Sequence, residues 1–250
     1  MNIAGITTAD QILEREILMD SQLIYNRKLQ HWTFVWIYSK QAVKPCNNHA
    51  EDLSVASINP GVHTFLTWYS PMHGHGKIGD GDINRIIRLC LSLDNLCSRT
   101  SHAPACKRNS MRRAQARMRH RIKDLANEVH KKAALWFIRT FDAIMIPEFN
   151  SSAMSQWKNC SQTVCKMLSW GHSRFRQQLV SKAEEHGKVM FVSEAYTSKC
   201  RYIKNNLRGA KTYRCNEEKC RIIIDRDVNG ARGIFLRALP WFWGDLSHAN

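Results

Sequence analysis

The stretch IIIDRDVNGAR, residues 222–232, decides the fold because it reads as a strand that turns directly into a helix. Three consecutive isoleucines favour a buried strand, and the following helix is expected to run to about Ala238. Upstream, Ala143–Ile146 forms a second compact apolar strand, which Pro147 stops. Short apolar strands followed by helices predict an α/β fold.

Helical and strand patterns alternate through the neighbouring segments. Apolar residues recur at spacings of three and four from Met111 to Trp136, which predicts a long amphipathic helix. A further helix contains Phe175 and closes at Gly187, and Val189–Val192 reads as another buried strand. In such sheets, ligands gather at the carboxyl ends of the strands.

The N-terminal half supplies a hairpin. Leu53–Ile58 and Val62–Tyr69 read as its two strands, and Asn59-Pro60-Gly61 between them fits a type II turn. Pro71–Asp82 is predicted to be a loop rich in Gly and His, and residues 1–50 contain one predicted strand, Trp32–Tyr38.

The charge of the chain points to a polyanionic partner. Its 250 residues carry 37 Lys and Arg against 21 Asp and Glu, a net charge of +16, and the sequence pI is about 9.7. Nucleic acid is the commonest such partner, and an anionic membrane or a merely basic protein is the alternative. The charge clusters, because residues 101–132 hold ten Lys and Arg but only two acids. The candidate nucleic-acid-binding residues are Arg112, Arg113, Arg117, Arg121, Lys199, Lys204 and Lys211.

Two carboxylates stand where a metal site would need them. Glu148 directly follows the Ala143–Ile146 strand and its proline, and Asp227 lies where the last helix begins. Two-metal cleavage of a phosphodiester requires several carboxylates to converge on a pair of Mg²⁺ ions. The alternative interpretation is that Asp227 caps its helix and Glu148 is a solvated strand end. Asn59, in the hairpin, occupies the position of a third ligand.

The cysteines favour a reducing, intracellular setting. Nine is an odd number, and no apolar N-terminal run with a cleavage site precedes them. Cys200, Cys215 and Cys220 lie in a basic segment with little apolar content, where zinc is one way to hold the chain together. Free thiols are the alternative, since only one pair is closely spaced. The apolar stretches are shorter than the ~20 residues of a membrane span.

Five ordered motifs carry a resemblance to a known family. The chain resembles the RuvC core of TnpB proteins and Fanzors, which are themselves similar to miniature type V CRISPR effectors. The resemblance spans Leu23 to Leu239, and its motifs are NPGVHTFLTWYSP (59–71), GKIGDGDINRIIRLC (76–90), IMIPEFN (144–150), EAYTSKC (194–200) and CRIIIDRDVNGARGI (220–234).

The resemblance implies a domain organisation. The expected fold is an α/β, RNase H-like (RuvC) mixed sheet with a long helical insertion and a small zinc-ribbon-like module before the last helix. Residues 1–50 would be a truncated remnant of a wedge domain, without a recognition region, and 51–195 the nuclease core. Residues 196–222 would be the target-nucleic-acid-binding module, and 223–250 the C-terminal helix of the core.

The resemblance also implies an activity, RNA-guided and Mg²⁺-dependent cleavage of DNA. It makes Glu148 and Asp227 the second and third metal-binding carboxylates, and Asn59 stands where the family has the first Asp. Cys200 matches one cysteine of the first zinc pair, and Cys215 with Cys220 matches the second pair with two residues inserted.

Because a neutral amide cannot bridge two metal ions, we expect the Mg²⁺ site to be weak or lost. The interpretation we prefer is a DNA-binding protein with impaired or absent cleavage. A weakly active RuvC-type endonuclease and a non-functional transposon remnant are the alternatives. The expected partner is DNA, with a guide RNA left open, and neither a membrane nor a small-molecule substrate. The expected location is the nucleus in a eukaryotic host and the cytoplasm otherwise.

Overall fold

The computed structural model describes residues 20–35, 37, 53–147, 168–186, 188–192, 211–214 and 223–247. The chain forms two compact units. The first comprises residues 1–43 with 91–121, and the second comprises residues 44–90 with 122–250. Among the described helices, none is long and apolar enough to cross a lipid bilayer.

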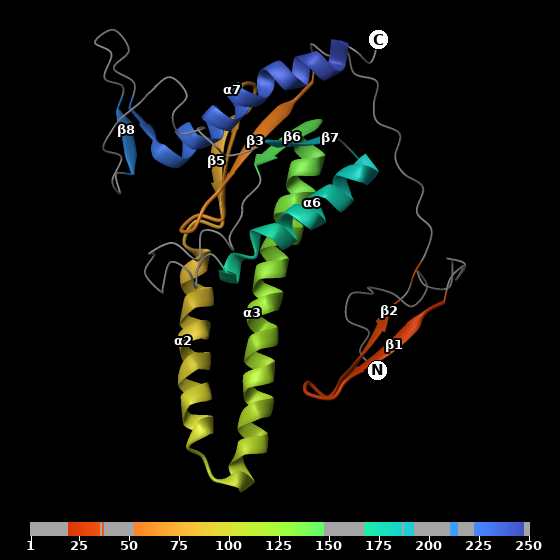
Figure 1. Ribbon diagram of the computed structural model, residues 1–250, viewed down its shortest axis with the longest axis vertical. Helices are drawn as coiled ribbons and strands as arrows, with labels where there is room; N and C mark the ends of the chain where they lie inside the picture. Colours follow the sequence, from red (N-terminus) through yellow and green to blue (C-terminus); the bar gives the residue numbers. More distant parts are fainter. Residues whose placement is uncertain are drawn as a thin grey trace. The chain divides into compact units, whose positions relative to one another are not determined.

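A five-stranded mixed sheet forms the centre of the second unit, with strands in the order β5-β4-β3-β6-β7 (Figure 1). β3 pairs antiparallel with β4 and parallel with β6, β4 pairs antiparallel with β5, and β6 pairs parallel with β7. The strands are β3 (Val55–Pro60), β4 (Leu66–Ser70), β5 (Gly74–Ile78), β6 (Ala143–Pro147) and β7 (Lys188–Val192).

Both faces of the sheet are covered, which explains why β6 is buried throughout and β3 at every residue except the half-buried Asn59. On one face, α7 (Arg226–Ser247) packs against Val55, Ala143 and Met145. On the other face, Ala56 and Ile144 join a core with residues of α3 (Ala105–Thr140) and α6 (His172–His186). The second unit is therefore a three-layer α/β structure, as the alternation of strands and helices predicts.

The first unit contains a small hairpin and parts of two long helices. β1 (Gln22–Asn26) pairs antiparallel with β2 (His31–Val35). α2 (Asp82–Ser101) and α3 continue from this unit into the second one. The remaining two-stranded sheet joins β8 (Thr212–Arg214) to β9 (Ile223–Asp225) just before α7.

Most predicted strands and helices of the second unit are confirmed, but three sequence-based expectations are wrong. The segment Pro71–Asp82 is not a loop throughout, since Gly74–Ile78 pairs along β4 as an edge strand. The strand predicted at Trp32–Tyr38 is confirmed over residues 32–35, but it is not a single strand, because it pairs with β1, whose sequence has little pattern of its own.

The third correction concerns Asn59-Pro60-Gly61, which is not a type II turn. Asn59 and Pro60 are the last residues of β3 and pair with Thr67 and Leu66. Gly61 does not have a positive φ. Its lack of a side chain matters for another reason, because a Cβ there would lie 2.5 Å from the Thr64 carbonyl oxygen.

Candidate functional site

Two side chains of β3 hold the first turns of α7. Asn59 donates a hydrogen bond from Nδ2 to the Asp227 carbonyl oxygen at 3.0 Å. Ser57 donates from Oγ to the Ala231 carbonyl oxygen at 2.8 Å, and this bond is buried. Because side chains alternate along a strand, residues 57 and 59 share the face of β3 that meets α7. The predicted site residues Asn59 and Asp227 are thus in direct contact.

Gly230 allows this close approach. A Cβ at residue 230 would lie 2.7 Å from Asn59 Nδ2 and 3.3 Å from its Cγ. Any larger side chain would therefore push the Asn59 amide away from the helix. Gly230 and Asn59 form a complementary pair across the strand–helix interface.

Asp225, not Asp227, caps α7. Its Oδ1 accepts hydrogen bonds from the backbone N–H of Asp227 at 2.8 Å and of Val228 at 3.3 Å, as an N-cap side chain does. Its Oδ2 accepts from Lys77 Nζ at 2.8 Å. The carboxylate of Asp227 lies 3.5 Å from Nε of Arg226.

The contacts of Asp225 determine its charge state. Partial burial alone would raise the pKa of Asp225, but the hydrogen bonds from Lys77 and from two backbone N–H groups outweigh it and lower the pKa. The same hydrogen bond raises the pKa of Lys77. Both groups are therefore charged at neutral pH, and they fasten the start of α7 to β5.

A metal site at this place would need oxygen ligands from several segments. Glu148 lies outside the described residues, although the strand before it, β6, is parallel to β3 and ends at the same edge of the sheet. Asn59 turns its nitrogen, which cannot bind a cation, toward the helix carbonyl. Only the neutral Oδ1 of Asn59 is left to face a cation, and a neutral oxygen cannot bridge two metal ions as a carboxylate does.

The predicted zinc ligands Cys200, Cys215 and Cys220 also lie outside the described residues, as do Lys199 and Lys204. Within the described ranges, no three His, Cys, Asp or Glu side chains gather into a metal-binding group. Zinc binding therefore stays a prediction.

The predicted basic helix face is exposed. Arg112, Arg113, Arg117 and Arg121 all point to solvent from the part of α3 that belongs to the first unit. On the opposite side of the helix, buried Gln115 donates from Nε2 to Thr100 Oγ1 at 2.7 Å and so ties α3 to α2. Lys211, immediately before β8, is exposed as well.

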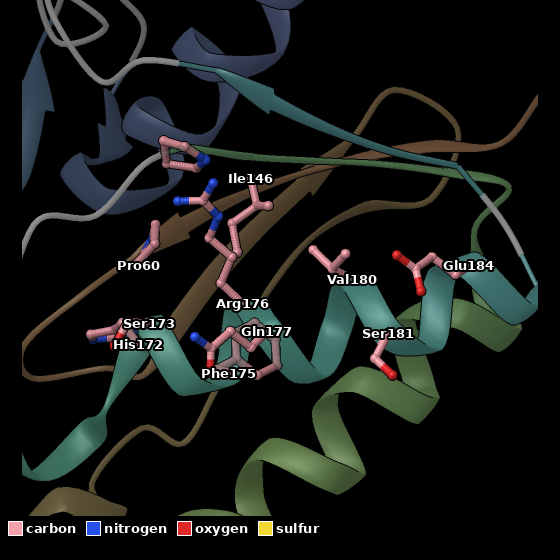
Figure 2. A pocket seen from close by; sticks show the side chains of 11 residues that line it. Pro60, Ile146, His172, Ser173, Phe175, Arg176, Gln177, Val180, Ser181 and Glu184 are labelled. Carbon is pink, nitrogen blue, oxygen red and sulfur yellow. The ribbon is translucent and has the colours of Figure 1, made fainter.

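A cavity of about 640 Å³ opens between α6 and the ends of β3 and β6 (Figure 2). Pro60, Ile146 and Pro147 contribute the sheet side of its lining, and Phe175 and Val180 contribute apolar surface from α6. Its polar lining residues are His172, Ser173, Arg176, Gln177, Ser181 and Glu184.

Two buried histidines pack beside this cavity. His130 and His172 both stack on Phe65, with ring centroids 5.1 and 5.2 Å away and interplanar angles of 16° and 13°. His130 Nε2 contacts the Trp170 carbonyl oxygen at 2.6 Å, and His172 Nε2 contacts that of Gly61 at 2.9 Å. Burial lowers the pKa of each ring to about 4, so both are neutral at pH 7.

Sequence reasoning missed several residues of this region. Ser57 could have been found, because it lies two places before Asn59 on the same strand face. Asp225 carried an N-cap signal equal to that of Asp227. The sequence around Lys77 and His172 held no sign of their partners, because these partners are 148 and 111 residues away along the chain.

Comparison with known proteins finds a protein-family match in the C-terminal part of the chain. The family described as Cas12f1-like, TNB domain matches residues 172–234, from the start of α6 into α7. A candidate transposase of Paramecium bursaria Chlorella virus 1 is 26% identical over 221 residues, which are 84% of this chain and 48% of that protein. A candidate transposase of Acanthamoeba polyphaga mimivirus is 23% identical over 216 residues, covering 82% and 44% of the two chains.

The fold is also similar to two solved structures. One is a cryo-EM structure of a CRISPR-Cas12f ternary complex, with a TM-score of 0.55 and 15% identity, covering 86% of this chain and 44% of that one. The other is a Cas12f1–sgRNA–target DNA complex, with a TM-score of 0.51 and 16% identity, covering 86% and 55%. The chain spans less than half the length of the two viral relatives.

Proposed function

Because this chain is a TnpB/Cas12f-like protein, we propose that it binds DNA along the arginine face of α3 and has lost most or all of the family's Mg²⁺-dependent cleavage. We further infer that its sheet is an RNase H-like, RuvC-type core. The similar solved structure that is named for its complex with sgRNA and target DNA supports nucleic acid as the partner.

The observation that carries the binding proposal is the stripe formed by Arg113, Arg117 and Arg121. These exposed residues follow one another at four-residue intervals, so they lie along one line of α3. Like charges at this spacing destabilise a helix by a few tenths of a kcal/mol per pair. A bound phosphate backbone removes that repulsion and releases its own counterions.

The observation that supports impaired cleavage is the orientation of the Asn59 amide. Its donor nitrogen engages the Asp227 carbonyl at 3.0 Å, which leaves one neutral oxygen on a side chain that would have to be a carboxylate to bridge two metal ions. If cleavage persists, Glu148 and Asp227 would have to bind the metal without a third carboxylate at position 59.

A salt titration tests the binding proposal. The unmodified chain should lose affinity for duplex DNA with a log–log slope of about −0.9 for each phosphate contact. Replacing Arg113, Arg117 and Arg121 together by alanine should flatten that slope by about 3 × 0.9, or ~2.7. The charge-matched control replaces Arg85, Lys132 and Arg139, which are exposed on α2 and α3. An equal loss in both triple variants, or no binding by the unmodified chain, would reject the proposal.

A nuclease assay with Mg²⁺ tests the second part. The purified chain should cut single- or double-stranded DNA no faster than a variant with Asp227→Ala. Efficient cutting that Asp227→Ala abolishes would establish the weakly active nuclease instead. Metal analysis of the same preparation decides whether zinc is bound.

A further inference from the structure

We propose that Ser110 is a phosphorylation site for a serine kinase that selects basic substrates, and that a phosphate there blocks the arginine stripe of α3. The stripe is formed by Arg113, Arg117 and Arg121. This inference rests on the proposed DNA binding and adds a means of regulating that same surface.

The sequence before Ser110 distinguishes it from the other hydroxyl side chains of the chain. It reads Lys107-Arg108-Asn109-Ser110, and no other Ser or Thr of the 250 residues has a basic residue both two and three places before it. Kinases choose their substrates partly by charge, and an acidic substrate groove binds Lys and Arg that precede the target hydroxyl. Ser110 is therefore the residue that such a kinase would select.

The first two turns of α3 are held weakly, so they can open to present this segment. Every residue from Pro104 to Ser110 is exposed, and little packing against the described residues keeps these turns in place. The helix begins directly after Pro104, which has no side-chain oxygen to cap it, and its first turn contains no acidic residue. A helix end without a cap or a buried contact frays readily.

The side-chain bonds of this segment are also exposed. Ser110 donates from Oγ to the Lys107 carbonyl oxygen at 2.9 Å, and Arg108 donates from Nε to that of Ala103 at 2.7 Å. Both bonds join residues of the same short stretch, so they are lost only when the stretch itself opens. Opening exchanges them for bonds to water, which leaves Ser110 Oγ and the Arg108 guanidinium accessible to a kinase.

The helix is anchored immediately after Ser110. Met111 is half-buried, and buried Gln115 donates from Nε2 to Thr100 Oγ1 of α2 at 2.7 Å. Opening of the first two turns breaks neither of these contacts. The arginine stripe, which begins at Arg113, therefore stays helical while Ser110 is modified.

The modification adds a strong anion to this basic surface. Ser110 Oγ attacks the γ-phosphorus of ATP, ADP leaves, and the hydroxyl proton passes to a base of the kinase. The resulting phosphoserine carries a charge of roughly −1.5 to −2 at pH 7 and three acceptor oxygens. Such a charge offsets roughly half to two-thirds of the positive charge of the three stripe arginines.

Ser110 lies on the same side of α3 as the arginine stripe. It precedes Arg113 by three residues and Arg117 by seven, and helical residues at these spacings share one face. A phosphate on Ser110 would therefore lie within reach of the Arg113 guanidinium, which can bind it through two parallel hydrogen bonds. The phosphate would then occupy an arginine that DNA otherwise contacts.

Phosphorylation of the full chain tests the modification site. A purified serine kinase that requires basic residues two and three places before its target, supplied with ATP, should transfer one phosphate to each chain. Peptide mapping by mass spectrometry should place it on Ser110, and the Ser110→Ala variant should lose it. Phosphate on other serines, with Ser110 unmodified, would overturn the proposal.

Fluorescence anisotropy with labelled duplex DNA tests the effect on binding. Compared with the unmodified protein, the phosphorylated protein should bind about 8-fold more weakly at 0.1 M salt, and the log–log salt slope should flatten by about 0.9, as expected for one lost phosphate contact. Ser110→Glu should change both quantities in the same direction but less. The charge-matched control Asn95→Glu, at an exposed position of α2, should change neither.

A variant without the stripe shows whether the phosphate acts through it. In the chain with Arg113, Arg117 and Arg121 replaced by alanine, phosphorylation of Ser110 should weaken DNA binding little further. An equal 8-fold loss in this variant would reject the block of the stripe. Thermal melting of each form confirms that a weaker affinity does not come from unfolding.

The outcomes also separate this proposal from the previous one. If the unmodified chain binds DNA through the stripe but phosphoserine at residue 110 leaves the affinity unchanged, the regulation is refuted and the binding function stands. If the unmodified chain does not bind DNA, the proposed function and its regulation both fail.

Discussion

The side-chain amide of Asn59 donates a hydrogen bond to the main-chain carbonyl of Asp227 across 3.0 Å, so the strand and the helix are joined by a donor that aspartate lacks. Asn59→Asp would place a carboxylate oxygen against that carbonyl. Losing the hydrogen bond costs about 1 kcal/mol, and the repulsion adds to this cost. We therefore expect Asn59→Asp to lower the free energy of unfolding by about 2 kcal/mol, measured by urea denaturation in the presence of EDTA.

Asn59→Ala is the matched control for this prediction. It removes the donor without adding a charge, so the free energy of unfolding should fall by a smaller amount, about 1 kcal/mol. If Asn59→Asp is as stable as the unmodified chain without metal, the hydrogen bond does not hold α7, and residue 59 is merely a lost metal ligand.

Gly230→Ala tests the same contact from the helix side. In an exposed helix this change would stabilise the protein by up to ~1 kcal/mol, since glycine is a poor helix former. Here the new Cβ would lie 2.7 Å from Asn59 Nδ2, and such overpacking typically costs about 1–3 kcal/mol. We expect Gly230→Ala to destabilise the unmodified chain.

In an Asn59→Ala background, Gly230→Ala should raise the free energy of unfolding instead of lowering it, because the side-chain nitrogen that the new methyl group would meet is gone. Urea denaturation of the two single variants and the double variant measures this coupling. A penalty of equal size in both backgrounds would mean that Gly230 is required for some other reason.

The order of the strands and helices could be predicted because it depends on local patterns. The apolar segment before Pro147 is a buried strand, as its apolar residues and β-branching indicate. The isoleucine run before Asp225 is also a strand, but it pairs with β8 and is not buried, since Ile223 is 65% exposed. β5 escaped prediction because its sequence, GHGKI, has no apolar pattern, and only pairing with β4 makes it a strand. Asn59-Pro60-Gly61 was misread because local turn preference competed with the β3–β4 register, and the register prevailed.

The candidate site was predictable only in part. Proximity of Asn59 to Asp227 followed from placing both at strand ends, but the direction of the amide did not, since it depends on a helix carbonyl 168 residues away. The cavity beside α6 left no sequence signal, because residues of β3, β6 and α6 form it jointly.

The stacked histidines predict a stability that depends on pH. The pKa of His130 and of His172 is lowered from 6.5 to about 4 in the folded protein, chiefly by burial. The unfolded chain therefore binds more protons between these values, and stability falls as the pH drops from 6.5 to 4. At pH 5 the loss is about 2 kcal/mol for each histidine relative to pH 7.5.

His172→Gln separates this effect from general acid denaturation. Glutamine can still donate to the Gly61 carbonyl but does not titrate. The variant should be less stable than the unmodified chain at pH 7.5, where the ring packs on Phe65, yet lose less stability between pH 7.5 and pH 5. Equal losses over this range, measured by urea denaturation, would show that the pKa of His172 does not differ between the folded and the unfolded protein.

The cap of α7 allows a prediction that distinguishes hydrogen bonding from charge. Asp225→Ala removes the acceptor for the Asp227 and Val228 N–H groups and should cost about 1 kcal/mol. Asp225→Asn keeps an N-cap acceptor and removes only the attraction to Lys77. Since both partners of that ion pair are about one-third exposed, at 35% and 36%, the pair itself should contribute well under 1 kcal/mol. Thermal melting should therefore rank the stabilities as unmodified, Asp225→Asn and then Asp225→Ala, with Lys77→Met close to Asp225→Asn. If Lys77→Met is instead as damaging as Asp225→Ala, the ion pair, and not the cap, is what fastens α7 to the sheet.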